Sequence, residues 1–307
     1  MRICYLVLAY NNIDDTVETL EGIAQQQYDN IDVFIVDNKS NEVYAKPLRE
    51  YAGQHHITYF YRDINDGYAG GNNYGWNCLK DKYDYVFVVN NDIIFNDREL
   101  TSKIIHIFET NSDIAIVGPT ILYDDNKQID DSRLHKLFFY KLCTDHIYKK
   151  TDDFTEMPSV VGCFLAIRVS AINTDKLFDD SFFMYGEELD LCLRVWNYGW
   201  SVVHMNDRIS TIYHKGGMSP FNERTPSWKF YLCMRNSILC ARNFTLWYAF
   251  LFVILHFIAV FRIALFSKYN KQCRMCSWRG FLKGCYFILF RKPSAIILAD
   301  AQKALIK

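Results

Sequence analysis

The stretch that most constrains the fold is residues 85–95, which read YVFVVNNDIIF. Its first half is a nearly continuous run of β-branched and aromatic residues, which is typical of a strand buried on both faces of a parallel sheet. The run ends at Asn90, Asn91 and Asp92 before apolar residues resume at Ile93. Ligands of open α/β sheets bind just beyond the carboxyl ends of the strands, so this turn is a candidate site for a divalent cation. A loop of good turn-forming residues is the alternative.

Strands and helices alternate along the first 220 residues. A buried strand over residues 3–9 ends at Tyr10 and Asn11, and a second strand over residues 31–36 ends at Asp37. Further strands are expected at residues 57–61, 114–117 and 160–169, with two short ones around 201–212. This alternation predicts βαβ units and a mostly parallel sheet, and hence an α/β fold.

Residues 65–75 (NDGYAGGNNYG) are rich in glycine and asparagine, and we expect a loop that runs into a short helix. Gly67, Gly70 and Gly71 would let the backbone approach a ligand closely. Amides that lead into a helix N-terminus can also hold phosphate. The segment matches neither the GxGxxG dinucleotide fingerprint nor the GxxxxGK[ST] P-loop, and a tight structural turn is the alternative.

Three acidic residues, Glu187, Glu188 and Asp190, open an amphipathic helix. Asp190 is expected to pair with Arg194 at i+4 on the same helix face. Glu187 and Glu188 follow the aromatic residues 182–185, where a carboxyl group could have a raised pKa and act as a base. Compensation of the helix dipole is the alternative role of these acids.

His214 is followed by two glycines and could bind a metal ion or contact a diphosphate. A structural or merely exposed histidine is the alternative. Tyr10, Asn11, Asp37, the segment 65–75 and Asp92 all follow the carboxyl ends of predicted strands. We therefore expect them to line one edge of one sheet.

Taken in order, seven motifs resemble the family 2 glycosyltransferases, and in particular their bacterial rhamnosyltransferase-like branch. The motifs are YNN after the first strand, VDNKS, NDGYAGGNNYG, VVNND, GCFLAIR, FFMYGEELDLCLR and HKGG, and they extend over about residues 1–220. The resemblance implies a GT-A fold, an inverting mechanism, a nucleotide-sugar donor and usually Mg²⁺ or Mn²⁺.

The resemblance also implies roles for individual residues. The donor would be bound by Tyr10, Asn11, Asp37, Asn65, Gly67, Gly71, Asn72, Asn90 and Asn91. The metal ion would be held by Asp92 and His214, the base would be Glu188 or its neighbour Glu187, and the acceptor side would include Gly162, Cys163 and Tyr185. Asn90 stands where the family has the first Asp of Asp-x-Asp, and Glu188 stands where many relatives have Asp. The strictness of metal dependence and the choice of base therefore stay open.

Charge is divided unevenly along the 307 residues, although the net charge is only −1. Residues 1–223 hold 34 acids and 20 Lys/Arg, hence −14, whereas residues 224–307 hold one acid and 14 Lys/Arg, hence +13. Residues 246–261 are apolar except for His256, and a membrane span needs about 20 apolar residues.

We therefore predict a catalytic domain over residues 1–220 and a helical, basic tail over residues 221–307. The tail would lie in the interface of an anionic membrane. The alternative is an apolar helix packed on the catalytic domain or in a dimer interface.

The resemblance and the tail together predict a glycosyltransferase of bacterial surface polysaccharide assembly, such as O-antigen or capsule. It would transfer a sugar from dTDP-rhamnose or a UDP-hexose to a lipid-linked saccharide, at the cytoplasmic face of the plasma membrane. Ten scattered cysteines fit that reducing compartment.

Three alternatives were weighed. A sugar-phosphate nucleotidyltransferase would carry a GxGxR-like loop where this chain has Tyr10, Asn11 and Asn12. A non-catalytic, membrane-bound sugar-binding protein would show no transfer in vitro. A nucleic-acid binder fits less well, because long apolar runs separate the basic residues of the tail.

Overall fold

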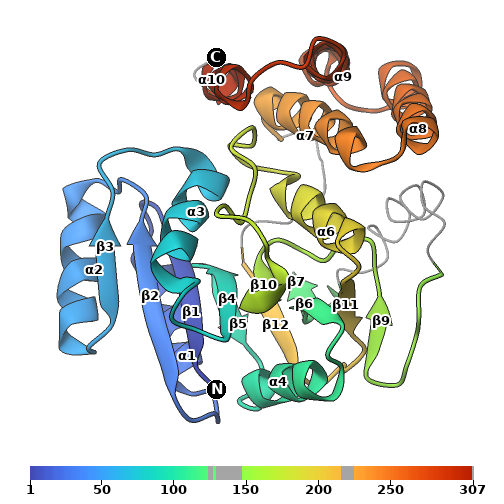
Figure 1. Cartoon of the computed structure of the whole chain (residues 1–307). Helices are drawn as coiled ribbons and strands as arrows, with labels where there is room; N and C mark the ends of the chain where they lie inside the picture. Colours follow the sequence, from blue (N-terminus) through green and yellow to red (C-terminus); the bar gives the residue numbers. More distant parts are fainter. Residues whose placement is uncertain (124–126, 129–146, 216–224, 306–307) are drawn as a thin grey trace.

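A computed structural model describes residues 1–123, 127–128, 147–215 and 225–305 of the chain. Over these residues the molecule has an α/β part, which contains two sheets, and a layer of C-terminal helices (Figure 1). The helical layer lies across one end of the α/β part, next to α3 and α6.

The main sheet has eight strands in the order β3-β2-β1-β4-β10-β6-β11-β9. The strands are β1 (Ile3–Ala9), β2 (Ile31–Asp37), β3 (Thr58–Tyr61), β4 (Tyr85–Asn90), β6 (Ile114–Gly118), β9 (Phe154–Glu156), β10 (Phe164–Arg168) and β11 (Ser201–Met205). The first four strands of this order pair in parallel, as do β6 and β11, whereas β10 runs antiparallel to both β4 and β6. The prediction of an α/β fold with a mostly parallel sheet is confirmed, and the antiparallel strands β10 and β9 make the sheet mixed.

A second sheet of four strands adjoins the carboxyl end of β4. Its order is β5-β12-β7-β8, with β5 (Ile93–Phe95), β7 (Thr120–Tyr123), β8 (Lys127–Gln128) and β12 (Thr211–His214). Ile93 at the start of β5 pairs with His214 at the end of β12. This pairing brings His214 to the turn after β4, although the two lie far apart in the sequence.

Helices cover both faces of the main sheet. They are α1 (Asp14–Ala24), α2 (Glu42–Gln54), α3 (Gly67–Leu79), α4 (Leu100–Thr110) and α6 (Glu187–Asn197), with a 3-10 turn η1 (Val169–Ala171). Apolar residues of α1, α2 and α4 pack in one core, and those of α3 and α6 pack in a second core on the opposite face. Alternate residues of β1 divide between the cores, because successive strand side chains point to opposite faces.

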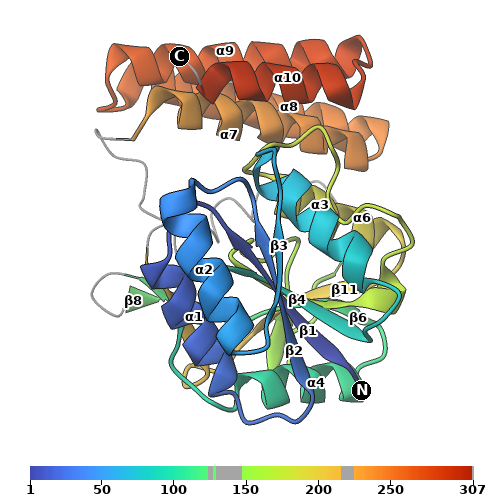
Figure 2. The same ribbon diagram turned by 90° about the vertical axis from the view of Figure 1, so that its left-hand side faces the viewer.

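The C-terminal helices are α7 (Ser227–Leu239), the 3-10 turn η2 (Cys240–Asn243), α8 (Leu246–Phe266), α9 (Lys271–Leu289) and α10 (Ser294–Leu305). Figure 2 shows α7, α8, α9 and α10 running alongside one another in a layer above the α/β part. Gly280 allows α9 to lie close to α7, since a Cβ at this position would be 2.4 Å from the carbonyl oxygen of Tyr231. Phe252 of α8 and Phe287 of α9 are buried in the second core, so the tail packs on the layer that contains α3 and α6.

The prediction of a loop over residues 65–75 is wrong from Gly67 onward, because helix α3 begins there. Gly67 has φ +82°, which lets the chain turn sharply into the helix. Gly71 and Gly75 then place the helix backbone against Leu8 and Leu6 of β1, where a Cβ would approach to 2.4 and 2.3 Å. Close packing on the sheet stabilises a helix in a segment whose composition indicated a loop.

The strand predicted over residues 160–169 is shorter in the structure, where β10 covers Phe164–Arg168. Val160 instead packs against the strand β6, where a Cβ on Gly118 would approach it to 2.7 Å. The predicted boundary between residues 220 and 221 falls within residues 216–224, which lie outside the described residues.

Candidate active site

One edge of the main sheet collects the predicted donor-binding and metal-binding segments. The register pairs Ala9 with Asp37 and Leu8 with Asn90, so β1, β2 and β4 end side by side. The antiparallel strand β10 begins at this same edge, since Phe164 pairs with Val89. The residues that precede β10, Gly162 and Cys163, therefore lie beside the turn after β4. The expectation of one shared edge is confirmed.

Hydrogen bonds within the chain hold the residues at the ends of β1 and β2, where a nucleoside is predicted to bind. Tyr10 is half exposed, whereas the Asp37 carboxylate is fully buried. Asp37 Oδ1 accepts a hydrogen bond from the Ser40 amide at 2.7 Å, and Asp37 Oδ2 accepts one from the Tyr59 hydroxyl at 2.7 Å. Asn11, in the left-handed region at φ +49°, accepts a hydrogen bond from the backbone N–H of residue 41. Binding of a nucleoside by these residues stays a prediction.

The start of α3 is equally crowded with protein contacts. A Cβ on Gly67 would lie 2.1 Å from the carbonyl oxygen of Phe183, so this glycine contacts protein at the place where we expected a ligand. Asn65 Oδ1 accepts hydrogen bonds from the Gly67 amide and from the Asn38 side chain. Asn72 is fully buried, and its Oδ1 has no hydrogen-bond partner among the described residues. Of these predicted donor-binding residues, Asn72 has a buried acceptor left free for a ligand.

The turn after β4 brings a carboxylate and an imidazole together. Asp92 Oδ1 lies 3.2 Å from His214 Nε2, and the Asn90 side-chain nitrogen lies 3.3 Å from that same ring nitrogen. Asn91 points away from this pair and donates a hydrogen bond to Thr16 of α1. Burial lowers the pKa of His214, but the adjacent Cys163 and Asp92 outweigh it and raise the pKa to about 10.

Among the described residues, this pair has no further metal ligands beside it, so it would need others to hold a divalent cation. Asp92 Oδ1 is buried and receives no hydrogen bond within the described residues, apart from its ion-pair contact with His214. Among the residues that the structure describes, no group of three or more His, Cys, Asp or Glu side chains could hold a metal ion. Mg²⁺ is commonly bound by one or two carboxylates, with phosphate and water oxygens completing the shell. Asp92 supplies one carboxylate of this kind, and binding of a metal ion by Asp92 and His214 stays a prediction.

A second turn presents the two candidate bases. Tyr185 and Gly186 both have left-handed backbones, with φ +68° and φ +92°, and α6 begins immediately after them. The Glu188 carboxylate accepts a hydrogen bond from the Gly186 amide at 3.0 Å. Glu187 is 5% exposed, and its Oε2 has no partner among the described residues. Burial raises the pKa of Glu187 well above its ordinary value, and the Glu188 carboxylate adds to the effect.

Residues 162 and 163 connect the two turns. A Cβ on Gly162 would lie 3.3 Å from Glu188 Cβ, so this glycine makes room for the glutamate. Its neighbour Cys163 lies beside His214. Glu188 and His214 therefore lie against two consecutive residues at the same edge of the main sheet.

Sequence reasoning missed Tyr68, which the fold brings to this region. The Tyr68 hydroxyl donates a hydrogen bond to the carbonyl oxygen of Gly162 at 2.5 Å. Burial raises the pKa of Tyr68 well above its ordinary value, and the adjacent Glu187 carboxylate contributes further. The two partners are 94 residues apart in sequence, so no local pattern could indicate their contact.

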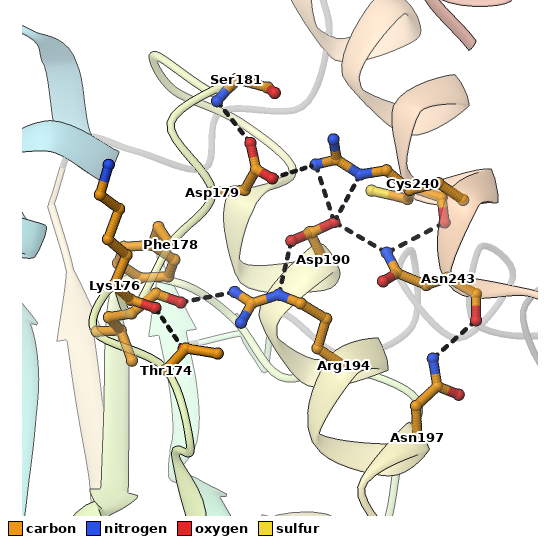
Figure 3. A network of polar contacts seen from close by, with 12 residues as sticks. Thr174, Lys176, Phe178, Asp179, Ser181, Asp190, Arg194, Asn197, Cys240 and Asn243 are labelled. Carbon is orange, nitrogen blue, oxygen red and sulfur yellow. Dashed lines mark hydrogen bonds and ion pairs between the residues drawn. The ribbon is translucent and has the colours of Figure 1, made fainter. Parts of the chain in front are cut away.

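Asp190 has the structural role that its spacing predicted. Its Oδ2 accepts a hydrogen bond from Arg194 Nε at 3.0 Å, as expected for an i+4 pair (Figure 3). Its Oδ1 also accepts from Asn243 at 2.8 Å and from Arg242 at 3.2 Å, and Arg242 pairs with Asp179 at 3.1 Å. The network joins α6 to η2 of the tail, a connection that the sequence did not indicate.

Two family models match the sequence. Residues 4–174 match the one described as "Glycosyl transferase family 2". Residues 97–290, which include most of the tail, match the one described as "Glycosyl transferase family group 2".

Two curated proteins are similar to parts of the chain. It is 23% identical over 209 residues to the rhamnosyltransferase WbbL of Escherichia coli (strain K12). The aligned residues cover 62% of this chain and 76% of WbbL. It is 26% identical over 164 residues to the low-salt glycan biosynthesis hexosyltransferase Agl10 of Haloferax volcanii, which covers 52% of each protein.

Solved structures resemble the whole fold at low sequence identity. S. aureus TarS 1-349 in complex with UDP superposes with a TM-score of 0.59 at 14% identity, over 87% of this chain and 73% of that one. The mannosyltransferase PcManGT from Pyrobaculum calidifontis, in complex with GDP-Man and Mn²⁺, superposes with a TM-score of 0.59 at 13% identity. The superposition covers 95% of this chain and 88% of PcManGT. These likenesses show a GT-A fold. Because the first family model matches more than half of the sequence, the chain belongs to glycosyl transferase family 2.

Proposed function

We propose that this family 2 glycosyltransferase inverts the anomeric carbon as it moves a sugar from a nucleoside diphosphate to a hydroxyl of a saccharide. The observation that carries the proposal is the contact of Gly162 with Glu188 and of Cys163 with His214. It supports a candidate base and a candidate counter-charge for the leaving diphosphate near the same edge of the sheet. An in-line displacement needs both groups.

In this proposal Glu188 is the general base. It would take the proton of the acceptor hydroxyl as the oxygen attacks the anomeric carbon, and the bond from that carbon to the diphosphate would break. Glu188 is less buried than Glu187, whose raised pKa favours the neutral acid. Asp92 and His214 would hold Mg²⁺ or Mn²⁺, which supplies positive charge to the diphosphate when bound.

The donor and acceptor are proposed from the relatives and from the tail. WbbL is a rhamnosyltransferase and Agl10 a hexosyltransferase, so we propose dTDP-rhamnose or a UDP-hexose as the donor. A lipid-linked saccharide in bacterial surface polysaccharide synthesis would be the acceptor. Such an acceptor suits a chain whose tail exposes apolar side chains.

The test of this function is a screen of the purified full chain against single nucleotide sugars, each with and without Mn²⁺. We expect one donor to raise the unfolding temperature selectively and to release its nucleoside diphosphate when an acceptor is added. Release of pyrophosphate from a nucleoside triphosphate and a sugar phosphate would instead indicate a nucleotidyltransferase. Donor binding without any turnover would indicate a sugar-binding protein.

We also propose that α8 lies in the membrane interface. Among the described residues, α8 is the helix that is long and apolar enough to cross a membrane. Only 11% of its most apolar stretch is buried in the structure. Its exposed side chains include Trp247 and Phe250, and exposed Leu282 and Leu289 of α9 extend the apolar surface. Since α8 lies alongside α7 and α9 (Figure 2), the surface favours a helix parallel to the membrane at its cytoplasmic face.

Vesicle sedimentation tests this location with matched variants. The double variant Trp247→Asp with Phe250→Asp should lose binding to vesicles that contain anionic lipid, because charged groups do not enter the acyl boundary. Tyr198→Asp is the control, because Tyr198 is also about half exposed but lies at the end of α6 in the α/β part. Resistance of the native chain to both high salt and carbonate would show a spanning helix instead.

A further inference from the structure

The turn before α6 needs support from outside itself. Tyr185 is a non-glycine residue with φ +68°, and Gly186 follows with φ +92°. Two consecutive left-handed residues form a local conformation that the surrounding structure must stabilise, particularly at a bulky residue. Any relaxation here would rotate the first turn of α6, which carries Glu187 and Glu188.

Asn236 of α7 makes the contacts that hold this turn. Its side-chain nitrogen donates hydrogen bonds to the carbonyl oxygens of Met184 at 2.9 Å and Tyr185 at 2.6 Å. Asn236 is fully buried, and a Cβ on Gly186 would lie 3.3 Å from Asn236 Cβ. One helical turn later, the Cys240 thiol lies 3.6 Å from the carbonyl oxygen of Gly186. Three successive carbonyl groups of the turn therefore face two side chains of the tail.

Arg235 fixes the orientation of the Asn236 amide. Arg235 Nε donates a hydrogen bond to Asn236 Oδ1 at 2.8 Å, which directs the amide nitrogen at the turn. The guanidinium is fully buried, and its Nη1 donates to the Ile297 carbonyl at 2.9 Å and to Asp300 at 3.1 Å. The turn is thus connected through Asn236 and Arg235 to α10.

The first turn of α6 itself is held by η2, which directly follows α7. Asp190 accepts hydrogen bonds from Arg242 and Asn243 there (Figure 3). The turn before α6 and the first turn of α6 are therefore held by two successive segments of the tail, α7 and η2.

We propose that Asn236 is a positioning residue, which orients Glu187 and Glu188 by holding the carbonyl groups of the preceding turn. The proposal rests on the proposed function only for its kinetic consequence. An acid displaced by about 1 Å would miss the acceptor proton, and errors of that size cost on the order of 10²-fold in rate. The donor site, which lies at the ends of β1, β2 and β4, should be unaffected.

The experiment compares Asn236→Asp and Asn236→Ala with Ser237→Ala in the full chain. Asp keeps the size of the side chain and can still accept from Arg235, but it has no N–H to donate. Ala removes the amide without adding charge, and it decides the matter if the Asp variant does not fold. Ser237 is the control, since it donates only to the Cys233 carbonyl within α7.

We expect both Asn236 variants to lower kcat by about 10–100-fold while the KM for the donor stays within about twofold. Hydrogen exchange at residues 185–190 should accelerate at least about tenfold, with exchange in α9 unchanged. Ser237→Ala should match the wild type in every measurement. A native kcat and native exchange in the Asn236 variants would overturn the proposal, and so would equal acceleration throughout the tail helices. If no donor supports turnover in the wild type, the proposed function fails while the exchange measurement still decides how the turn is held.

Discussion

The molecule presents carboxylates on two turns, and the turns are held in different ways. The turn after β4, which carries Asp92, is fixed by neighbouring backbone: the Asn90 amide donates to the Cys163 carbonyl at 2.9 Å, and the Lys215 amide donates to the Asp92 carbonyl at 3.1 Å. The turn before α6, which carries Glu187 and Glu188, is held by side chains of α7 and η2.

This difference teaches where each turn is vulnerable. Backbone hydrogen bonds between strands do not depend on side-chain identity, so the Asp92 turn should depend less on side chains, of which Asn91 donates to Thr16 of α1. The turn before α6 depends on a few buried polar side chains of the tail, and a buried polar group left without its partner costs about 1–3 kcal/mol. The turn that carries Asp92 should therefore be robust to changes in the tail, and the turn that carries Glu187 and Glu188 should be sensitive to them.

The largest expected effect is on the base. Glu188→Gln keeps the shape of the side chain but cannot take a proton, and loss of a general base typically lowers the rate by about 10²–10⁴-fold. Donor binding, measured by calorimetry, should be nearly unchanged because the loss is confined to the chemical step. Glu187→Gln should cost less in turnover. The reverse result would make Glu187 the base, and native turnover in both variants would remove this turn from catalysis.

Loss of the Asp190 network should be the next largest effect. Asp190 is 1% exposed, so Asp190→Ala leaves Arg194 and Arg242 without their shared carboxylate. Breaking a buried ion pair in this way typically costs about 3–5 kcal/mol. Urea unfolding would measure the change in the free energy of unfolding.

Asp175→Ala is the control for this measurement. Asp175 pairs with Lys80 at 2.7 Å, but its side chain is 93% exposed. Exposed pairs contribute about 0–1 kcal/mol. If both variants lose equally little, the tail does not hold α6 through this network, and the contrast between the two turns disappears.

Much of the fold could be read from the sequence, because the signals were local. The apolar runs of β1 and β4 and the acids at the start of α6 lie within single elements, and the structure confirms these elements. The i+4 spacing of Asp190 and Arg194 is also local, and the pair forms. The shared sheet edge followed from strand direction alone.

Other parts of the site depend on contacts between distant segments. The sequence does not indicate that Gly67 and Gly71 leave room for Phe183 and Leu8, which lie where a Cβ of these glycines would be. Asn236 lies 51 residues from Tyr185, and nothing in the pattern of α7 marks it as a partner of the turn before α6. Which small or polar residue meets which neighbour is decided by tertiary packing, and composition does not contain that information.

A smaller effect is expected at the Asp92 turn. Asp92→Asn removes one charge from the predicted metal site, so the affinity for the metal ion should fall. The Mn²⁺ concentration for half-maximal transfer should rise accordingly, with little change in urea unfolding, because backbone hydrogen bonds hold the turn. Asp29→Asn is the control, since Asp29 is exposed before β2, at the opposite end of the strands. A native Mn²⁺ requirement in Asp92→Asn would exclude this carboxylate as a ligand.

The smallest effect concerns the stability of the acid turn and its dependence on pH. Burial and the Glu188 carboxylate raise the pKa of Glu187 in the folded protein, whereas an unfolded glutamate titrates near about 4.3. Above that pH the folded protein binds more protons than the unfolded chain. The free energy of unfolding therefore falls as pH rises from the pKa of the unfolded glutamate toward the pKa of Glu187 in the folded protein. Glu187→Gln has no proton to lose.

The variant should therefore unfold at a higher temperature than the wild type at pH 8, with the difference shrinking toward pH 5. Scanning calorimetry across this range would measure it, with Glu21→Gln on the exposed side of α1 as the control. A difference that does not change with pH would mean that Glu187 titrates alike in both states. Glu187 is buried at the turn that the tail holds. Its effect on the free energy of unfolding would then have to come from packing and not from charge. The turn before α6 would no longer be the one of the two turns at which a buried charge destabilises the fold.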